Sequence, residues 1–304
     1  MKVLRFNDDR VGVLKDGDRV VDVSDTVDHR VEKGPQRVME EVIGDFDTFR
    51  GRFEDAVSGA DGVALSSVTL LAPIPRPGKC LAAFGNYLDT PGRTKEDMVM
   101  DFFYKAPDLL GPEGTIELVD IPPVAVWQPE AEIAFVVGKD AKNVAEADAY
   151  DHIFGYVPFF DISARGLNRR TQFIPKGQDT YAVCGPWITT RDEVENPHNL
   201  RVQSWVNEGL RQDYNTKDMA HSIPEQVVWL SRFVHLHPGD VITTGTYHPG
   251  LGPLNDGDVL EIEIERLGRA RFFAHSDGPR KEVDFMPGRP QPGAPAASSG
   301  FTPV

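Results

Sequence analysis

The order of apolar and polar residues separates a short N-terminal part from a longer part. Val3–Phe6 and Val11–Leu14 are predicted strands, and Asp16-Gly17 predicts a hairpin turn after the second of them. Five apolar residues then recur at helical spacing and predict one helix: Val38, Val42, Phe46, Phe49 and Phe53. Because three prolines punctuate residues 72–78, residues 1–71 are expected to form a small N-terminal α/β domain.

The longer part, residues 72–286, continues with recognisable elements. Ser222–Glu225 has the pattern of a capping box, and the apolar stripe behind it predicts a helix to Val234. His235 and His237 are expected at the end of that helix, where cationic side chains are favoured. Val144–Ile153 is a predicted short helix. The last residues, 287–304, are rich in Pro, Gly, Ala and Ser and predict a flexible C-terminal tail.

Three acidic residues stand in or beside segments with the pattern of buried strands. Glu130 and Glu132 open the apolar run Ile133–Val137. Because side chains in a strand alternate between faces, the two carboxylates point the same way, about 7 Å apart along the backbone. Asp161 follows two phenylalanines and precedes an isoleucine, a setting that offers no reason for a carboxylate other than a ligand or an ion pair.

A divalent cation would resolve the repulsion between these carboxylates if the fold brings them together. At 4 Å each like-charged pair costs about 4 kcal/mol at an effective dielectric constant of about 20, and burial adds a desolvation cost. An all-oxygen site without neighbouring Cys or His favours a hard ion, Mg²⁺ first, with Mn²⁺ or Ca²⁺ as alternatives. A Glu-x-Glu pair alone is more often a solvated strand edge, so the metal hypothesis depends on Asp161.

The composition is that of a soluble enzyme. A chain of 304 residues can bury a large core, and a net charge of -15 argues against binding nucleic acid. Two cysteines, Cys80 and Cys184, provide neither a disulfide framework nor zinc spacing, which favours a reducing compartment. The first residues lack a signal-peptide pattern, and no uncharged run approaches the roughly 18 residues of a membrane span. We therefore expect a cytoplasmic protein with no membrane partner.

Seven short segments follow one another in a characteristic order: Gly85-Asn86-Tyr87, Phe103–Pro107, Glu130-x-Glu132, Asp161–Arg165, Lys176-Gly177-x-Asp179, Arg211–Met219 and Gly239–Thr246. Together they resemble the fumarylacetoacetate hydrolase family over roughly residues 70 to 275. The resemblance implies an α+β, mostly β fold, with a catalytic domain of mixed, rolled β-sheets over residues 72–286. It also implies one Mg²⁺ or Mn²⁺, a homodimer, and activity on diketo or 2-oxo acids.

The resemblance assigns roles to individual residues. At the matching positions, Glu130, Glu132 and Asp161 are the metal ligands. Arg165 and Lys176 would face the substrate as counter-charges for its carboxylate and for a developing oxyanion. Apart from the resemblance, ordinary ion pairs with the carboxylates would be the simpler explanation of these two cations. The remaining expected substrate contacts are Thr246, Tyr87, Ser163 and Asn168, the last standing where many relatives carry Gln.

The chain departs from the family just after Tyr87. Many hydrolytic members carry a His three residues later and a Glu three residues beyond that, a pair that activates water. Here these positions are Thr90 and Arg93, neither of which is a base near neutral pH. Gly166 is a second departure, at a position where relatives usually have Asp. A hydrolase would need a different base, and the candidates are Asp89, Glu96, Asp97 and His248.

The expected activity is hydrolysis of a C–C bond in a small diketo acid of the acylpyruvate type. His248 is one possible base, although a His beside Pro-Gly is more often a surface loop residue. A non-hydrolytic decarboxylase, dehydratase or isomerase of a metal-bound 2-oxo acid is the alternative. A third possibility is a relative that binds the metal but has lost activity. The homodimer rests on the resemblance and on the closed symmetry of most soluble oligomers.

Overall fold

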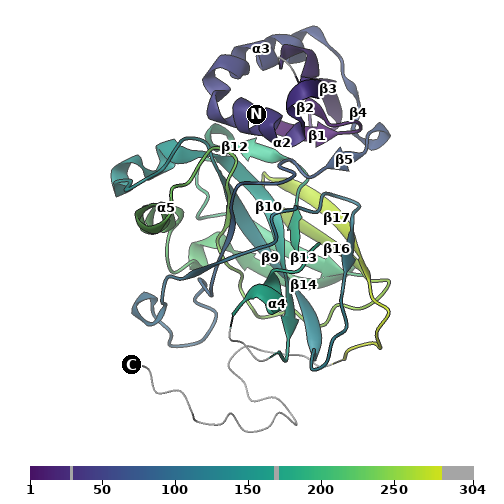
Figure 1. Cartoon of the computed structure of the whole chain (residues 1–304), viewed down its shortest axis with the longest axis vertical. Helices are drawn as coiled ribbons and strands as arrows, with labels where there is room; N and C mark the ends of the chain where they lie inside the picture. The colour runs from purple at the N-terminus through teal and green to yellow at the C-terminus, as the bar shows by residue number, and fades with distance from the viewer. Residues whose placement is uncertain (28–29, 168–170, 283–304) are drawn as a thin grey trace.

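The computed structural model describes residues 1–27, 30–167 and 171–282 (Figure 1). Within these ranges the chain forms mixed β-sheets with few helices, which confirms the predicted α+β, mostly β class. The predicted tail, 287–304, lies outside the described residues. No helix in the described part of the chain is long and apolar enough to cross a membrane.

The N-terminal segment folds as short strands covered by helices, at the top of Figure 1. Its strands are β1 (Lys2–Phe6), β2 (Arg10–Lys15), β3 (Arg19–Asp22), β4 (Val63–Ala64) and β5 (Leu70–Leu71). The predicted hairpin turn is confirmed between β2 and β3, which pair in antiparallel fashion. Asp16 and Gly17 both have positive φ there, 54° and 86°, a conformation that Gly adopts freely and Asp tolerates.

The predicted single helix is two helices. After the short α1 (Arg30–Lys33), α2 (Pro35–Gly44) and α3 (Phe46–Gly59) are separated at Asp45. Gly44 lies so close to Pro238 that a β-carbon there would meet the proline ring at 3.2 Å. The hydroxyl of Thr48 donates to the Asp45 carboxylate at 2.9 Å in the first turn of α3. The apolar residues of both helices belong to the same core cluster, so their helical spacing continues across the break and the pattern alone does not reveal it.

The longer part supplies the centre of the large sheet. Its strands there are β6 (Cys80–Ala83), β7 (Phe102–Tyr104), β9 (Val126–Val137), β10 (Ile153–Arg165), β11 (Ala182–Cys184), β12 (Ile188–Thr190) and β15 (Val241–Thr243). The order is β4-β3-β2-β1-β12-β10-β9-β15-β6-β7, with β5 beside β1 and β11 beside β10. Since β1 pairs with β12, the N-terminal strands extend this sheet. Independent folding of residues 1–71 stays a prediction.

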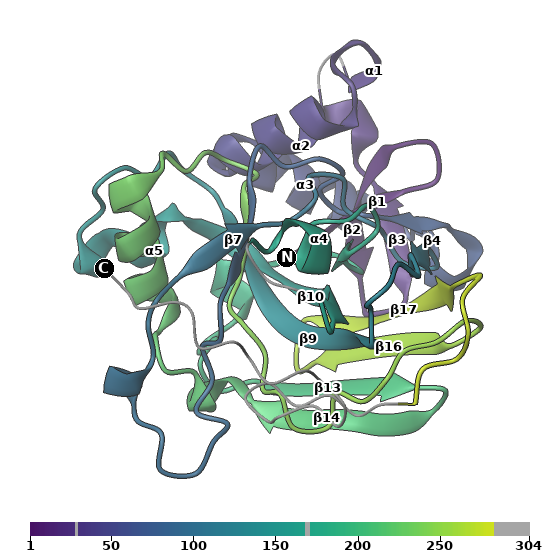
Figure 2. The ribbon, with the colours of Figure 1, turned by 60° about the horizontal axis from the view of Figure 1, so that its bottom comes forward.

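A second sheet packs under β9 and β10 (Figure 2). Its order is β14-β13-β16-β17-β8, formed by Gly209–Asn215, Arg201–Val206, Val259–Ile264, Gly268–His275 and Thr115–Glu117. The helices of this part are α4 (Phe173–Lys176) and α5 (Ile223–Phe233). The predicted capping box of α5 is confirmed, with Ser222 and Glu225 each bonding the other's backbone amide. The predicted helix near residue 150 is a set of 3₁₀ turns, Glu146–His152.

The paired strands β9 and β10 are buried along their whole length and place the site. Their side chains alternate between two cores. Ile133 and Phe160 face the second sheet, whereas Ala134 and Phe159 share a cluster with α2 and α3. By the same alternation, the acidic residues of β9 and β10 lie on the face that carries Ala134 and Phe159, farther along the strands. Polar side chains therefore continue an otherwise apolar face.

Candidate active site

The three carboxylates predicted to converge do so. The ladder between β9 and β10 sets Asp161 directly opposite Glu130, and Glu132 lies two residues along the same face of β9. One oxygen from each side chain lies within 4.8 Å of the others, and all three residues are buried. The sequence predicted the spacing of the two glutamates. The register of β9 against β10 determines that Asp161 lies beside them.

Three cations surround this triad. The Lys176 ammonium lies between Glu130 Oε2 and Asp161 Oδ2, at 2.6 and 2.7 Å. Lys105 is fully enclosed and donates to Asp161 Oδ1 at 2.5 Å. The Arg165 guanidinium pairs with Glu130, while its Nε donates to Gln128 at 3.0 Å. Three positive side chains thus offset three acidic ones, which is how the fold accepts so many buried charges.

The two glutamates of β9 have opposite electrostatic environments. Burial opposes ionisation of Glu130, but the charges of Lys176 and Arg165 outweigh it and hold its pKa well below the usual range. Burial raises the pKa of Glu132 well above its usual value, and repulsion from Asp161 and Glu130 raises it further. The cations pair directly with Glu130 and Asp161, and none of the described residues forms an ion pair with Glu132.

Glu132 shows that the donor set suits a metal ion. Its Oε2 accepts the Gly245 amide at 2.7 Å, but its Oε1 is buried with no hydrogen-bond partner in the described part of the chain. A buried carboxylate oxygen without a partner is costly, and a hard cation shared with Glu130 and Asp161 would remove that cost. Glu130, Glu132 and Asp161 are thus the residues that would hold Mg²⁺ or Mn²⁺.

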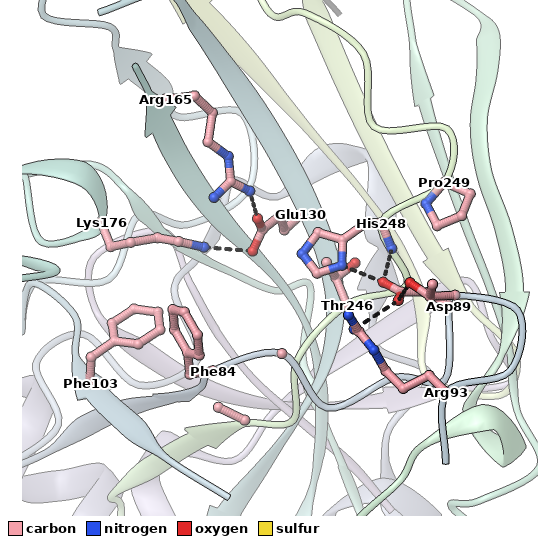
Figure 3. A pocket seen from close by; sticks show the side chains of 13 residues that line it. Phe84, Asp89, Arg93, Phe103, Glu130, Arg165, Lys176, Thr246, His248 and Pro249 are labelled. Carbon is pink, nitrogen blue, oxygen red and sulfur yellow. Dashed lines mark hydrogen bonds and ion pairs between the residues drawn. The ribbon is translucent and has the colours of Figure 1, made fainter. Parts of the chain in front are cut away.

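A cavity of about 260 Å³ opens over Glu130 (Figure 3). Arg165, Lys176 and Thr246 line it, as expected for the positions assigned to the substrate. The side chains of Phe84 and Phe103 form an apolar wall near Lys176. The cavity therefore combines a charged end at the carboxylates with an apolar side, which suits a small organic anion.

Two of the four candidate bases meet in this cavity. His248 Nδ1 lies 2.5 Å from Asp89 Oδ2, and both residues line the cavity. In Figure 3 the imidazole lies between Asp89 and Glu130. The other two candidates lie elsewhere, since the Glu96 side chain is exposed and the Asp97 carboxylate accepts the Thr94 amide at 2.9 Å.

The environment of Asp89 keeps it ionised. Burial would raise its pKa, but the hydrogen bond and charge of His248 outweigh burial, and the pKa is lowered. The guanidinium of Arg93, at a position where many hydrolytic relatives have Glu, lies 3.6 Å from the other oxygen of Asp89. Thr90 also lines the cavity. The segment that departs from the family thus contributes a carboxylate that orients an imidazole.

The remaining predicted contacts vary in position. Thr246 lines the cavity, with its hydroxyl donating to the Ala131 carbonyl at 2.7 Å. Ser163 lies between Asp161 and Arg165 on one face of β10, and its hydroxyl donates to the Asp161 carbonyl at 3.1 Å. Asn168 lies outside the described residues.

Tyr87 is not at the cavity wall. Its ring is buried and packs edge-on against Tyr214, with ring centroids 5.1 Å apart, so the structure gives it a packing role and no contact with the cavity. The second departure, Gly166, has a conformational reason. Its φ is 88°, and a β-carbon there would meet the Pro123 carbonyl oxygen at 2.7 Å.

Sequence reasoning missed two buried polar residues of the site. The resemblance assigns Lys105 no role beyond its place in a matching segment, although a lysine in so apolar a stretch is itself a signal of a buried ion pair. Gln212 accepts the Ala131 amide at 3.1 Å and donates to the Thr246 hydroxyl at 2.9 Å. It therefore holds the backbone between the two glutamates and the position of Thr246.

Comparison with known proteins settles the family. The family model described as "Fumarylacetoacetate (FAA) hydrolase C-terminal" matches residues 79–272, more than half of the chain. The chain belongs to the fumarylacetoacetate hydrolase family. The resemblance seen in the sequence is confirmed, and the matched residues include the carboxylate triad, Lys105, Asp89 and His248.

Relatives within the fumarylacetoacetate hydrolase family have different activities. Maleylpyruvate hydrolase of Aquipseudomonas alcaligenes is 34% identical over 289 residues, which cover 88% of this chain and 97% of that protein. A mitochondrial oxaloacetate tautomerase of Xenopus laevis is 37% identical over 219 residues, 67% of each chain. The structure of maleylpyruvate hydrolase from Sphingobium sp. SYK-6 in complex with manganese (II) ion and pyruvate has a TM-score of 0.81 at 34% identity, covering 91% of this chain and 99% of that one.

Proposed function

We propose that this protein is a divalent-metal-dependent hydrolase that cleaves a C–C bond of a small acylpyruvate-like acid. The observation that carries the proposal is the His248–Asp89 pair, which lies in one cavity with Glu130, Arg165 and Lys176. It provides a base that Thr90 and Arg93 cannot. Relatives of this length include maleylpyruvate hydrolases, one of them in complex with manganese and pyruvate, which supports the same reaction class and a divalent metal.

The charges around the triad suit a dianionic or monoanionic oxo acid. With the three acidic side chains ionised, Lys105, Lys176 and Arg165 offset them, so a bound Mg²⁺ or Mn²⁺ leaves the site positive and attractive to an anion. The ion held by Glu130, Glu132 and Asp161 would supply Lewis acidity at the oxo oxygens and stabilise the departing enolate. Arg165 can hold the substrate carboxylate at the cavity wall.

His248 would move the protons. With Nδ1–H donated to Asp89, Nε2 is the basic nitrogen and takes a proton from water. The resulting hydroxide attacks the acyl carbonyl carbon, the adjacent C–C bond breaks, and its electron pair passes to the pyruvate enolate. The imidazolium then returns the proton to the enolate carbon. Asp89 fixes the tautomer and stabilises the imidazolium, the part that the carboxylate has in a catalytic triad.

A non-hydrolytic reaction is the second candidate. Arg93 lies 3.6 Å from Asp89 and so shares with His248 the carboxylate that would orient a general base. Several relatives are oxaloacetate tautomerases, at 35–37% identity. In that reading His248 would transfer a proton between carbon and oxygen of a metal-bound 2-oxo acid, and no bond to water would form.

Product analysis separates the two candidates. Metal-free protein is reconstituted with Mn²⁺ or Mg²⁺ and supplied with a panel of acylpyruvates and with oxaloacetate in ¹⁸O-labelled water. Hydrolysis yields pyruvate and a second carboxylic acid in equal amounts, with the label in the new carboxylate. Faster enol–keto exchange of oxaloacetate without cleavage of any acylpyruvate would contradict hydrolysis and support the second candidate. Comparing the two metals decides which ion the enzyme uses.

A further inference from the structure

A second group of metal-ligand side chains lies on the surface, apart from the cavity. His235 and His237 flank Leu236, which is fully buried, so alternation directs both imidazoles outward. Their ring centroids are 4.3 Å apart, and both side chains are half exposed. The sequence predicted a helix end here. That prediction was wrong, because α5 ends at Phe233 and the histidines occupy an extended segment after it.

Asp140 completes the group from the other side of a short antiparallel bridge. Ala141 and Leu236 exchange backbone hydrogen bonds of 2.9 and 3.0 Å, which fixes Asp140 opposite the histidines. Its Oδ1 lies 2.6 Å from His237 Nδ1 and 3.6 Å from His235 Nε2. One ligand atom from each of the three residues lies within 4.8 Å of the others.

The backbone that carries the group is held by a buried carboxylate. The His237 amide donates to Asp240 Oδ2 at 2.9 Å, and Asp240 Oδ1 accepts the Lys79 amide at 2.7 Å. Asp240 is only 1% exposed. The backbone at His237 is therefore held in place before an ion arrives, and the exposed side chains of the three residues can adjust to the ion.

We propose that Asp140, His235 and His237 form a second metal site, selective for borderline divalent ions such as Zn²⁺, Ni²⁺ or Cu²⁺. Two imidazole nitrogens and one carboxylate favour these ions over Mg²⁺, which prefers oxygen ligands and is expected at the triad. Three protein ligands leave room for water or a further ligand. One bridged segment follows β9, which carries Glu130 and Glu132, and the other precedes β15, which leads to Thr246. An ion here would therefore link these two strands.

Calorimetry with Zn²⁺ tests the site. Tag-free protein is first saturated with millimolar Mg²⁺ to occupy the triad, and Zn²⁺ is then titrated into wild type, His235→Ala, His237→Ala and the control His275→Ala. His275 is also half exposed and lies 2.9 Å from Asp256, so it matches the chemistry of one histidine beside one aspartate. We expect one Zn²⁺ per chain in wild type and control, and affinity at least about tenfold weaker in the other two variants.

Two further measurements separate this site from nonspecific binding. Bound Zn²⁺ should raise the Tm of wild type and of His275→Ala but not of His237→Ala, because an ion that binds only the folded state stabilises it. Electron paramagnetic resonance of bound Cu²⁺ should show two imidazole nitrogens, and one in His235→Ala. Equal Zn²⁺ affinity in all four proteins, no binding to wild type, or loss in only one histidine variant would each overturn the proposal. Turnover should be unaffected, since the three residues do not line the cavity over Glu130.

Discussion

At the scale of single residues, Glu132 separates metal binding from stability better than Asp161 does. Asp161 pairs with two buried lysines, so its removal would leave Lys105 without a carboxylate in the described part of the chain and Lys176 with Glu130 alone. Glu132 forms no ion pair with any described residue, and Glu132→Gln keeps an acceptor for the Gly245 amide. We expect Mn²⁺ affinity to fall at least about a hundredfold, measured by calorimetry.

The same variant makes a pH prediction for the metal-free protein. The pKa of Glu132 is higher in the folded state than in the unfolded chain, so between these two pKa values the folded state binds more protons. Ionising this carboxyl therefore lowers the stability of the folded state as pH rises above the ordinary glutamate pKa of about 4.3. Glu132→Gln removes that loss. Urea unfolding at pH 4 and pH 7 should therefore show the variant gaining on wild type as pH rises. A variant that loses ground at pH 7 would contradict this electrostatic assignment.

The proton-transfer role of His248 is tested with conservative changes. His248→Gln should lower kcat about a hundredfold or more, because a general base typically contributes that much. It should leave Mn²⁺ affinity unchanged, because His248 is not one of the three proposed metal ligands. Asp89→Asn should also lower kcat, through loss of the orienting carboxylate. Glu96→Gln, an exposed acidic neighbour, serves as the control. Losses below tenfold in both His248→Gln and Asp89→Asn would sink the general-base mechanism.

At the scale of elements, Lys105 joins the segment after β7 to β10 and α4. Its ammonium contacts Asp161 and the carbonyl oxygens of Ile162 and Lys176 from a fully buried position. Burial lowers its pKa in spite of the Asp161 charge. Lys105→Met should reduce the free energy of unfolding by about 3 kcal/mol, because one partner of a buried ion pair is removed.

Lys95→Met is the matched control for this element-scale prediction. Lys95 pairs with Glu225 at the surface, with 45% of its side chain exposed, so its loss should cost less than about 1 kcal/mol. Urea unfolding of both variants gives the comparison. Equal, small losses would show that the buried pair is offset by its desolvation and that Lys105 does not secure β10.

At the scale of the whole molecule, the expected homodimer stays a prediction. Several large apolar side chains are exposed on the single chain, among them Phe173 at 67% and Phe233 at 66%, and a partner subunit would be one way to cover them. Light scattering at micromolar concentration should give a mass near twice 33.7 kDa. A mass near 33.7 kDa would rule the dimer out.

The sequence by itself determined what depends on neighbours along the chain. Alternation places Glu130 and Glu132 on one face of a strand, Ser222 and Glu225 form the capping box, and the ordered segments identify the family. These features repeat within a few residues, so a linear pattern contains them. The pattern failed at Asp45, where two helices pack into one core cluster and the break leaves the periodicity intact.

Only the tertiary structure decided which distant residues meet. The register of β9 against β10 set Asp161 opposite Glu130, and the fold brought His248 to Asp89, 159 residues earlier in the chain. Lys105 reached Asp161 in the same way, across 56 residues. Such contacts depend on how strands pair and sheets pack, which no local spacing encodes. The residues able to form a site could therefore be predicted from the sequence, whereas the choice of His248 and Asp89 over the other candidate bases required the fold.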